Sequence, residues 1–309
     1  MNKILLPVDF PNPSPGMIHQ AAFLARHFHS EIILLHVVPP LTYPAGMLES
    51  GHELTARDLH AEIIERAQKE LDESLRSELD GIAVKRLLLR GDPAKEIARM
   101  ARDEKVGLIV MSTHGHGVLY RFLLGSVAMK VLHDSDCPVW VTAHVEQAPA
   151  GEWALHNVLC AVDLNSHSLT TVSQAAQVAA EFGARLTLVH VTSSVETFGP
   201  GGSLVDPVWK EKIVGFAAKE IAKLQQDAGT HAEVIIDSGD VHKALNRAAE
   251  QTKADLLVIG HFPSGGHLGE NGSGYGIICQ SRIPVLSILR PQARSDDAPV
   301  SGVIPLTPL

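Results

Sequence analysis

The run Ile4-Leu5-Leu6-Pro7-Val8-Asp9-Phe10 returns later in the chain as Val158-Leu159-Cys160-Ala161-Val162-Asp163-Leu164. Asp9 and Asp163 are 154 positions apart. Leu34–Val37 matches Leu188–Val191 at the same separation of 154 positions. Three further matches follow in the same order at separations of 148, 148 and 146 positions: Gly91-Asp92 with Gly239-Asp240, Leu108–Met111 with Leu256–Ile259, and Cys137–Val139 with Ile283–Val285. Five ordered matches indicate a tandem duplication.

The chain length agrees with two repeats, because 309 residues make about two domains of roughly 150 residues each. The stretch Gln147–Gly151 is typical of a linker. We therefore expect a first domain over residues 1–145 and a second over residues 155–290. The segment 291–309 contains four prolines and no hydrophobic periodicity, and we expect a disordered tail there.

Each repeat alternates apolar runs with amphipathic patterns. In the first repeat the runs predict five strands: Lys3–Val8, Glu31–Val37, Val84–Leu89, Leu108–Ser112 and Pro138–Thr142. Between them, helical patterns run to Phe28, from Thr55 to Leu79, from Asp92-Pro93 onward and from Ser126 to His133. This order predicts an α/β protein with two tandem Rossmann-like domains, each an open five-stranded parallel sheet with helices on both faces.

Composition excludes several classes of protein. Hydrophobic residues make up 45% of the chain, so it should fold around real cores. The net charge of −9 argues against a sequence-independent nucleic-acid binder. No apolar run is long enough to span a membrane, and the N-terminus does not resemble a signal peptide. Three cysteines without paired spacing (Cys137, Cys160 and Cys279) favour a reducing cytoplasm.

Ligands of open α/β sheets bind outside the carboxyl ends of the strands, so the residues that follow the strands are the informative ones. After the fourth strand come Ser112-Thr113-His114-Gly115-His116-Gly117 and then Gly125-Ser126-Val127 at a helix start. Glycines let the backbone approach an anion, Ser126 could cap the helix, and a helix N-terminus offers free N–H groups. A tight loop that only needs flexible residues is the alternative explanation. No P-loop or dinucleotide-binding motif is present.

The spacing Ser112-x-x-Gly115, nine residues, Gly125-Ser126 resembles that of the universal stress protein family, whose ATP-binding members carry G-x2-G-x9-G-[ST] there. The similarity covers nearly the whole chain. It is most specific in Met111–Gly115, Leu123–Ala128 and Cys137–Val139. The resemblance implies the adenine nucleotide alpha hydrolase-like fold and an ATP site, with Mg²⁺, in the first domain.

The resemblance also implies which residues bind the nucleotide. Asp9, Pro7 and Val37, with Val8 beside them, match positions for the adenosine part, and Met111 and Ser112 match positions beside the ribose and phosphates. The phosphate-binding residues would be Gly115, Gly125, Ser126 and Val127. Ser112 departs from the motif by replacing its first glycine. Arg121 is a further candidate phosphate partner, although a solvated cation in a loop is the simpler interpretation of this residue. His114 and His116 could bind a metal, but the pattern disfavours that interpretation.

The second repeat lacks the motif, because Pro263 stands where the first repeat has Gly115 and proline has no N–H. Ala161 replaces Pro7, while Asp163 is retained. We expect an altered or absent site in this half. His36 and His190 lie near the ends of matching strands, and we interpret both as packed, hydrogen-bonded histidines.

Near the expected phosphates no carboxylate pair or activated nucleophile is evident, so we predict no efficient catalysis, although slow ATP hydrolysis stays open. Two functions remain. The first is a nucleotide-dependent sensor or regulator in a stress response, and the second is a structural scaffold that needs no nucleotide. We expect a homodimer, an unknown protein partner, and packing of the two repeats through their fifth strands, which are sheet edges. We expect no nucleic-acid or membrane partner.

Overall fold

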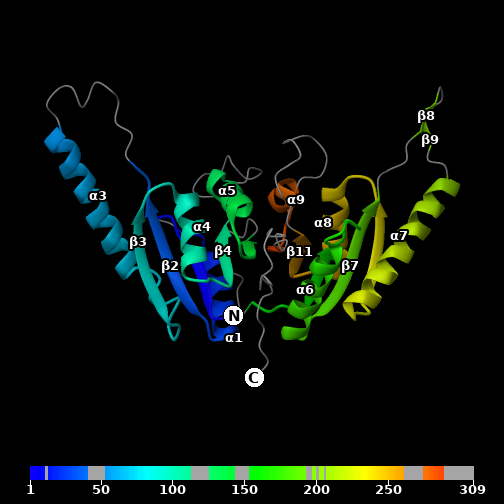
Figure 1. Ribbon diagram of the computed structural model, residues 1–309, viewed down its shortest axis with the longest axis horizontal. Helices are drawn as coiled ribbons and strands as arrows, with labels where there is room; N and C mark the ends of the chain where they lie inside the picture. The colour runs from blue at the N-terminus through cyan, green and yellow to red at the C-terminus, as the bar shows by residue number, and fades with distance from the viewer. Residues whose placement is uncertain are drawn as a thin grey trace, which may run out of the picture. The chain divides into compact units, whose positions relative to one another are not determined.

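The computed structural model of the protein is shown in Figure 1. It describes residues 1–10, 13–40, 53–112, 125–142, 153–192, 197–199, 202–204, 207–260 and 274–288. Contacts divide the chain into two compact units, the first containing β1 to β4 and the second containing β6 to β12. Within the described part of the chain, no helix combines the length and the apolar character needed to cross a membrane.

The first repeat follows the predicted order of elements. Its strands are β1 (Lys3–Pro7), β2 (Glu31–Val38), β3 (Val84–Arg90), β4 (Leu108–Ser112) and β5 (Val139–Thr142). Its helices are α1 (Pro15–Phe28), α3 (Glu53–Glu73), α4 (Pro93–Asp103) and α5 (Ser126–Asp134). The strand order is β3-β2-β1-β4-β5, and β1 pairs in parallel with both β2 and β4. The chain therefore changes direction across the sheet between β1 and β4, which is the switch point of the fold.

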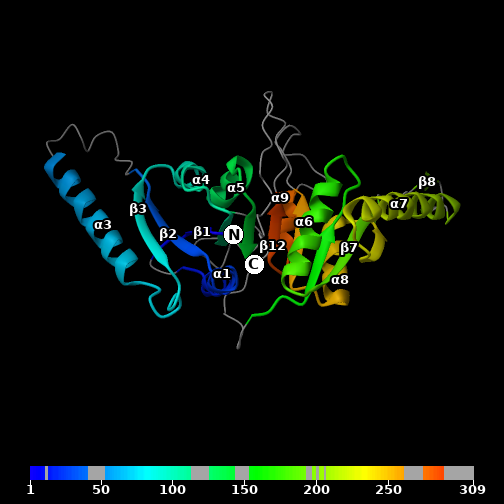
Figure 2. The same ribbon diagram turned by 60° about the horizontal axis from the view of Figure 1, so that its bottom comes forward.

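The core of this sheet consists of the apolar runs that the sequence predicts as strands. Ile4, Leu5 and Leu6 are fully buried, and so are the β2 residues opposite them. Burial of both faces requires helices above and below the sheet. Figure 2 shows α4 and α5 on one side of the sheet and α1 on the other. The predicted fold is confirmed.

One predicted helix is too long. The leucine pattern predicts a helix from Thr55 to Leu79, but α3 ends at Glu73. Leu75 has a left-handed φ of 55°, a conformation that cannot continue a right-handed helix. Leu79 is nevertheless buried, because the turn that follows the helix folds it onto the core. The spacing of the leucines thus correctly predicts that Leu79 is buried, but it predicts a helix that is longer than α3.

The second repeat has the same topology. Its sheet has the order β10-β7-β6-β11-β12, formed by β6 (Asn157–Ala161), β7 (Arg185–Thr192), β10 (Glu233–Ser238), β11 (Leu256–Gly260) and β12 (Val285–Ile288). Its helices are α6 (Ser168–Glu181), α7 (Pro207–Ala228), α8 (Val241–Thr252) and α9 (Gly274–Gln280). A short antiparallel pair that the sequence did not predict, β8 (Thr197–Gly199) with β9 (Gly202–Leu204), precedes α7. The expected domain boundaries, the tail and the packing of the fifth strands stay predictions.

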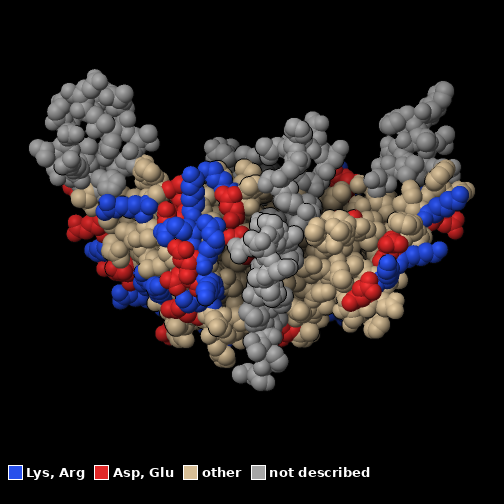
Figure 3. Space-filling view, in the orientation of Figure 1, with Lys and Arg blue, Asp and Glu red and all other residues tan. Residues whose placement is uncertain are grey.

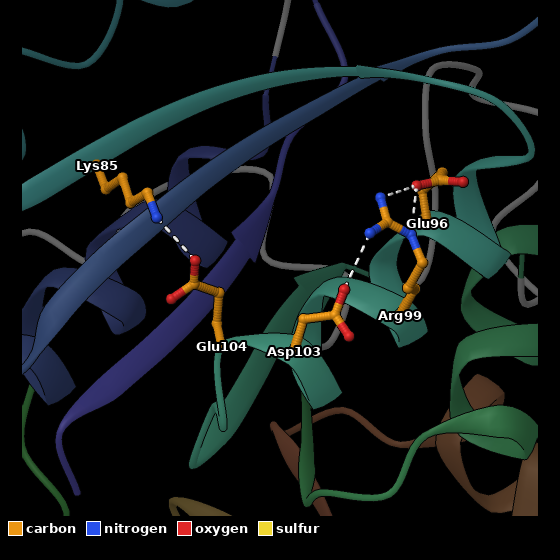
Figure 4. Close-up of polar contacts among 5 residues, drawn as sticks. All are labelled: Lys85, Glu96, Arg99, Asp103 and Glu104. Carbon is orange, nitrogen blue, oxygen red and sulfur yellow. Dashed lines mark hydrogen bonds and ion pairs between the residues drawn. The ribbon is translucent and has the colours of Figure 1, made fainter.

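Ion pairs fasten helix α4 to the strands of the first unit. The Glu104 carboxylate, just after α4, accepts hydrogen bonds from Lys3 of β1 at 2.5 Å and from Lys85 of β3 at 2.7 Å. Figure 4 shows the second of these bonds beside Arg99, which bridges Glu96 and Asp103 along α4. The hydrogen bond from Lys3, followed by that from Lys85, lowers the pKa of Glu104 to about 2. The C-terminal end of α4 is thereby held, and its N-terminal end lies at the cavity described next.

Candidate functional site

A cavity of about 350 Å³ lies at the switch point of the first repeat. Three strand ends open into it: residues 7–9 after β1, residues 35–37 at the end of β2, and Met111 and Ser112 at the end of β4. Residues at the starts of three helices also line it: the N-cap Ser14 and Met17 at α1, Pro93 and Ile97 at α4, and the N-cap Gly125 with residues 126–128 at α5. Its volume lies at the lower end of the range for pockets that hold small molecules and cofactors.

Nine of the ten predicted site residues line this single cavity: Pro7, Val8, Asp9, Val37, Met111, Ser112, Gly125, Ser126 and Val127. The tenth, Gly115, lies outside the described residues, as do Arg121, His114 and His116. The sequence reasoning missed Ser14, Met17, Pro93 and Ile97. The signals Ser14-Pro15 and Asp92-Pro93, each an N-cap followed by proline, mark helix starts and could have indicated them.

The strand-end part of the cavity is held by main-chain and imidazole hydrogen bonds. The Val8 N–H donates to the Leu35 carbonyl at 2.9 Å. His36 Nδ1 lies 2.9 Å from the Val8 carbonyl oxygen, and because a carbonyl only accepts, Nδ1 donates. The second repeat has the same pair of contacts, from Val162 to Val189 and from His190 to Val162. The prediction that His36 and His190 are packed, satisfied histidines is confirmed.

The helix starts around the cavity differ in how their N–H groups are capped. Ser14 accepts from the Met17 N–H in α1, and Asp92 accepts from the Ala94 and Lys95 N–H groups in α4, as predicted for Asp92. The hydrogen bond from the Lys95 N–H is the main cause that lowers the pKa of Asp92. In α5 the N-cap is Gly125, and no side chain caps the helix. Ser126 is the first helical residue and does not cap α5, which corrects the prediction.

An uncapped helix start is suited to bind an anion. The first N–H groups of a helix have no partner within the helix, and the helix dipole adds positive potential there. Three helices begin at the cavity. Side chains accept hydrogen bonds from the first N–H groups of α1 and α4, but no described side chain does so for α5. The cavity thus combines apolar walls at the strand ends with a donor-rich end at α5 and an exposed carboxylate, Asp9. This arrangement fits a flat apolar group that carries hydroxyls and a phosphate.

Nucleophilic and metal chemistry find little support among the described residues. Desolvation raises the pKa of the Cys137 thiol to about 11 and that of the Cys160 thiol to about 12, so both thiols stay protonated. The prediction that Cys137 belongs to the core is confirmed. No three histidine, cysteine or acidic side chains in the described ranges group as metal ligands would.

The equivalent region of the second repeat has a different set of contacts. Asp163, the counterpart of Asp9, accepts from the Ser168 hydroxyl at 2.8 Å and from the side-chain amide of Asn165. For Asp9, in contrast, no such bond is found among the described residues. Gly260 replaces Ser112, and a Cβ atom there would lie 3.0 Å from the Thr171 hydroxyl oxygen. The carboxylate is therefore engaged by its own loop, and the Thr171 hydroxyl lies close against Gly260.

These features define a class of protein: a tandem Rossmann-like α/β protein of the adenine nucleotide alpha hydrolase-like fold, with a cavity at one switch point. A model of the universal stress protein family matches residues 1–143 and again residues 154–269. The chain belongs to the universal stress protein family.

Individual relatives agree with this assignment. The universal stress protein MJ0531 of Methanocaldococcus jannaschii is 34% identical over 139 residues, which are 45% of this chain and 80% of that protein. The universal stress protein Rv2005c of Mycobacterium tuberculosis is 25% identical over 267 residues, covering 82% of this chain and 86% of that one. The solved structure of PA1789 from Pseudomonas aeruginosa, a protein of unknown function, covers 94% of this chain and 92% of its own, with 19% identity and a TM-score of 0.62, and shares the fold.

Proposed function

We propose that the first repeat binds an adenine nucleotide, ATP foremost, and that the protein is a nucleotide-dependent regulator in a stress response. The observation that carries the proposal is the uncapped N-terminus of α5 at one end of the switch-point cavity. Val37 and Met111, both nearly buried, would contact the base, and Asp9 would accept hydrogen bonds from the ribose hydroxyls. The N–H groups at Ser126 and Val127 would donate to the phosphates.

The proposal includes Mg²⁺ as a companion of the phosphates. The described residues at the cavity offer one exposed carboxylate, Asp9, and so present by themselves a poor ligand set for the ion. The ion would then bind through the phosphate oxygens and arrive with the nucleotide. The contacts that engage Asp163 support a single site per chain, because the matching carboxylate of the second repeat already accepts hydrogen bonds from Ser168 and Asn165.

The proposal also includes a homodimer in the cytoplasm. Three free cysteines, two of them buried, fit a reducing compartment.

Two measurements test the nucleotide site. Protein purified without added nucleotide is denatured, and the released small molecules are identified by mass spectrometry; ATP at one equivalent per chain is the expected result. Calorimetric titration of nucleotide-free protein with ATP, ADP, AMP and cyclic AMP, with and without Mg²⁺, ranks the ligands. If no adenine nucleotide is retained or binds, the proposal is wrong and the scaffold function takes its place.

Two matched variants locate the site. Asp9→Ala removes the exposed carboxylate of the first repeat, and Asp163→Ala removes its counterpart in the second. We expect ATP affinity to fall in Asp9→Ala and to stay unchanged in Asp163→Ala. The opposite pattern would place the site in the second repeat.

A further inference from the structure

Exposed apolar side chains gather on one helix of the second repeat. Among the described residues, four large hydrophobic side chains are exposed, and three of them lie on α7: Val208, Trp209 and Phe216, at 58%, 57% and 64% exposure. The Nζ atom of Lys212 lies 5.2 Å from the centre of the Trp209 ring, so a lysine already covers part of this apolar surface. Two exposed aromatic rings on one helix are unusual on a surface that contacts only water.

The aromatic rings belong to a continuous stripe, which we call the α7 stripe and define as Trp209, Lys212, Phe216, Lys219 and Lys223. Steps of three and four residues place all five on one side of the helix. All five are exposed, while the opposite side, with Ala217 and Ile221, is buried against the unit. In Figure 3 the region of α7, at the right, shows basic groups, acidic groups and uncharged surface side by side, so the basic character belongs to the stripe and not to the whole helix. The α7 stripe is therefore basic and aromatic on a chain whose net charge is −9.

The matching helix of the first repeat carries a different surface. Ala67 and Leu71 of α3 are buried as Ala217 and Ile221 are in α7, so we align the sequences of the two helices at a separation of 150 positions. At this separation, Lys212, Phe216, Lys219 and Lys223 correspond to Glu62, Arg66, Lys69 and Glu73, all exposed, which we call the α3 stripe. Over these four matched positions, the first repeat thus has a glutamate at each end and the second repeat has a lysine at each end.

The two stripes are complementary in charge at the positions Lys212 and Lys223 of one and Glu62 and Glu73 of the other, and these positions have the same spacing. Lys212 and Lys223 are 11 residues apart, and so are Glu62 and Glu73, which is about 16 Å along a helix. A helix pair laid side by side, in either direction, therefore forms both lysine–glutamate pairs at once. Between them Phe216 faces the guanidinium of Arg66 or the stem of Lys69, which are favourable neighbours for an aromatic ring.

One contact in this arrangement joins like charges, because Lys219 faces Lys69 or Arg66. Glu70 pairs with Arg66 at 3.0 Å in an exposed ion pair and offsets part of this charge. An anionic bilayer is a poorer occupant, since the net charge of −9 opposes approach to it.

We propose that the α7 stripe docks on the α3 stripe of a second copy of this chain. The contact joins unlike surfaces, so it differs from a contact of two identical sheet edges, and it leaves a free stripe of each kind unless the assembly closes. Exposed ion pairs are individually weak, so the association is weak and sensitive to salt. It does not depend on the proposed nucleotide site.

Charge reversal and its rescue test the proposal. Sedimentation equilibrium over a concentration series at low salt would measure association of the full chain and of three variants. The double variant Lys212→Glu/Lys223→Glu and the double variant Glu62→Lys/Glu73→Lys should each associate at least about tenfold more weakly. The variant that combines all four changes should return to within about threefold of the original chain, because both pairs are restored with opposite sign.

The control is Lys95→Glu/Lys243→Glu, which makes the same charge change at exposed lysines of α4 and α8 and should leave association unaltered. Circular dichroism confirms that each variant is folded. The proposal is wrong if the variant with all four changes does not regain the association of the original chain. It is also wrong if Glu62→Lys/Glu73→Lys associates as strongly as the original chain does. Vesicles of phosphatidylcholine and phosphatidylglycerol in equal amounts provide a second readout. If the chain does not self-associate but co-sediments with these vesicles, and Lys212→Glu/Lys223→Glu abolishes that co-sedimentation, the α7 stripe binds lipid instead.

Discussion

Substitution of Ser126 by proline tests the anion-binding end of the cavity with little risk to the fold. Ser126 is the first residue of α5 and is exposed, and proline is favoured at this helix position because its missing N–H has no partner within the helix. Proline also requires an extended residue before it. Gly125 has φ −57° and ψ 143°, which already meets that requirement. Ser126→Pro therefore deletes one N–H and one hydroxyl from the cavity and keeps the helix.

The size of the effect follows from the number of donors removed. A hydrogen bond to a charged group contributes about 1.5–3 kcal/mol, which corresponds to a change in affinity of about ten- to a hundredfold. Ser126→Ala removes the hydroxyl alone and serves as the reference. We expect ATP to bind Ser126→Pro at least about tenfold more weakly than Ser126→Ala, with adenosine affinity the same in both.

The assay is calorimetric titration of each variant with ATP and with adenosine, accompanied by thermal unfolding. Equal ATP affinity in the two variants would show that the phosphates do not contact the start of α5. A parallel loss of adenosine affinity would show that proline disturbed the cavity as a whole. The first outcome would refute the assignment of α5 as the phosphate-binding helix, and the second would refute the premise that the substitution acts on the phosphate end alone.

Three further predictions concern stability and reactivity. Lys3 and Lys85 lower the pKa of Glu104 to about 2, so the contribution of Glu104 to the stability of the fold is present above about pH 4.5 and is lost as the pH falls towards 2. In urea unfolding, Glu104→Gln should lose less stability between about pH 5 and pH 3 than the original chain does. Equal losses would contradict the stabilising role of these ion pairs. Leu71 is a fully buried residue of α3, so Leu71→Ala should lower the free energy of unfolding by about 2–5 kcal/mol, whereas Lys69→Ala on the exposed side of the same helix should change it by less than about 0.5 kcal/mol. Cys137 and Cys160 are buried and have raised pKa values, so a thiol reagent at about pH 8 should modify at most Cys279 in the native protein. In denaturant the reagent should modify all three cysteines. Rapid modification of Cys160 without denaturant would show that β6 opens readily.

The sequence predicts the fold well because its signals are local. Apolar runs such as Ile4–Leu6 predict buried strands without reference to any partner, and the fixed separation between Asp9 and Asp163 reveals the duplication. The cap at Asp92 with Pro93 after it marks a helix start wherever the helix later packs. The end of α3 was missed because the leucine spacing continues through a turn that Leu75 makes in a left-handed conformation.

The nine predicted site residues that line the cavity were found through a family motif and the rule for strand ends, both of which are patterns in the chain. The tertiary structure adds what no pattern contains, because it depends on groups distant in sequence that meet in space. Glu104 meets Lys3, 101 residues away, and thereby anchors α4. Asp163 accepts a hydrogen bond from Ser168, whereas Asp9 has no such bond among the described residues, although both carboxylates are exposed and the two strands match in sequence. The sequence determined that the chain is duplicated and that the second repeat lacks the motif. Tertiary contacts, which depend on which side chains face each other after folding, decided that Asp163 is engaged by its neighbours and that Asp9, among the described residues, is not.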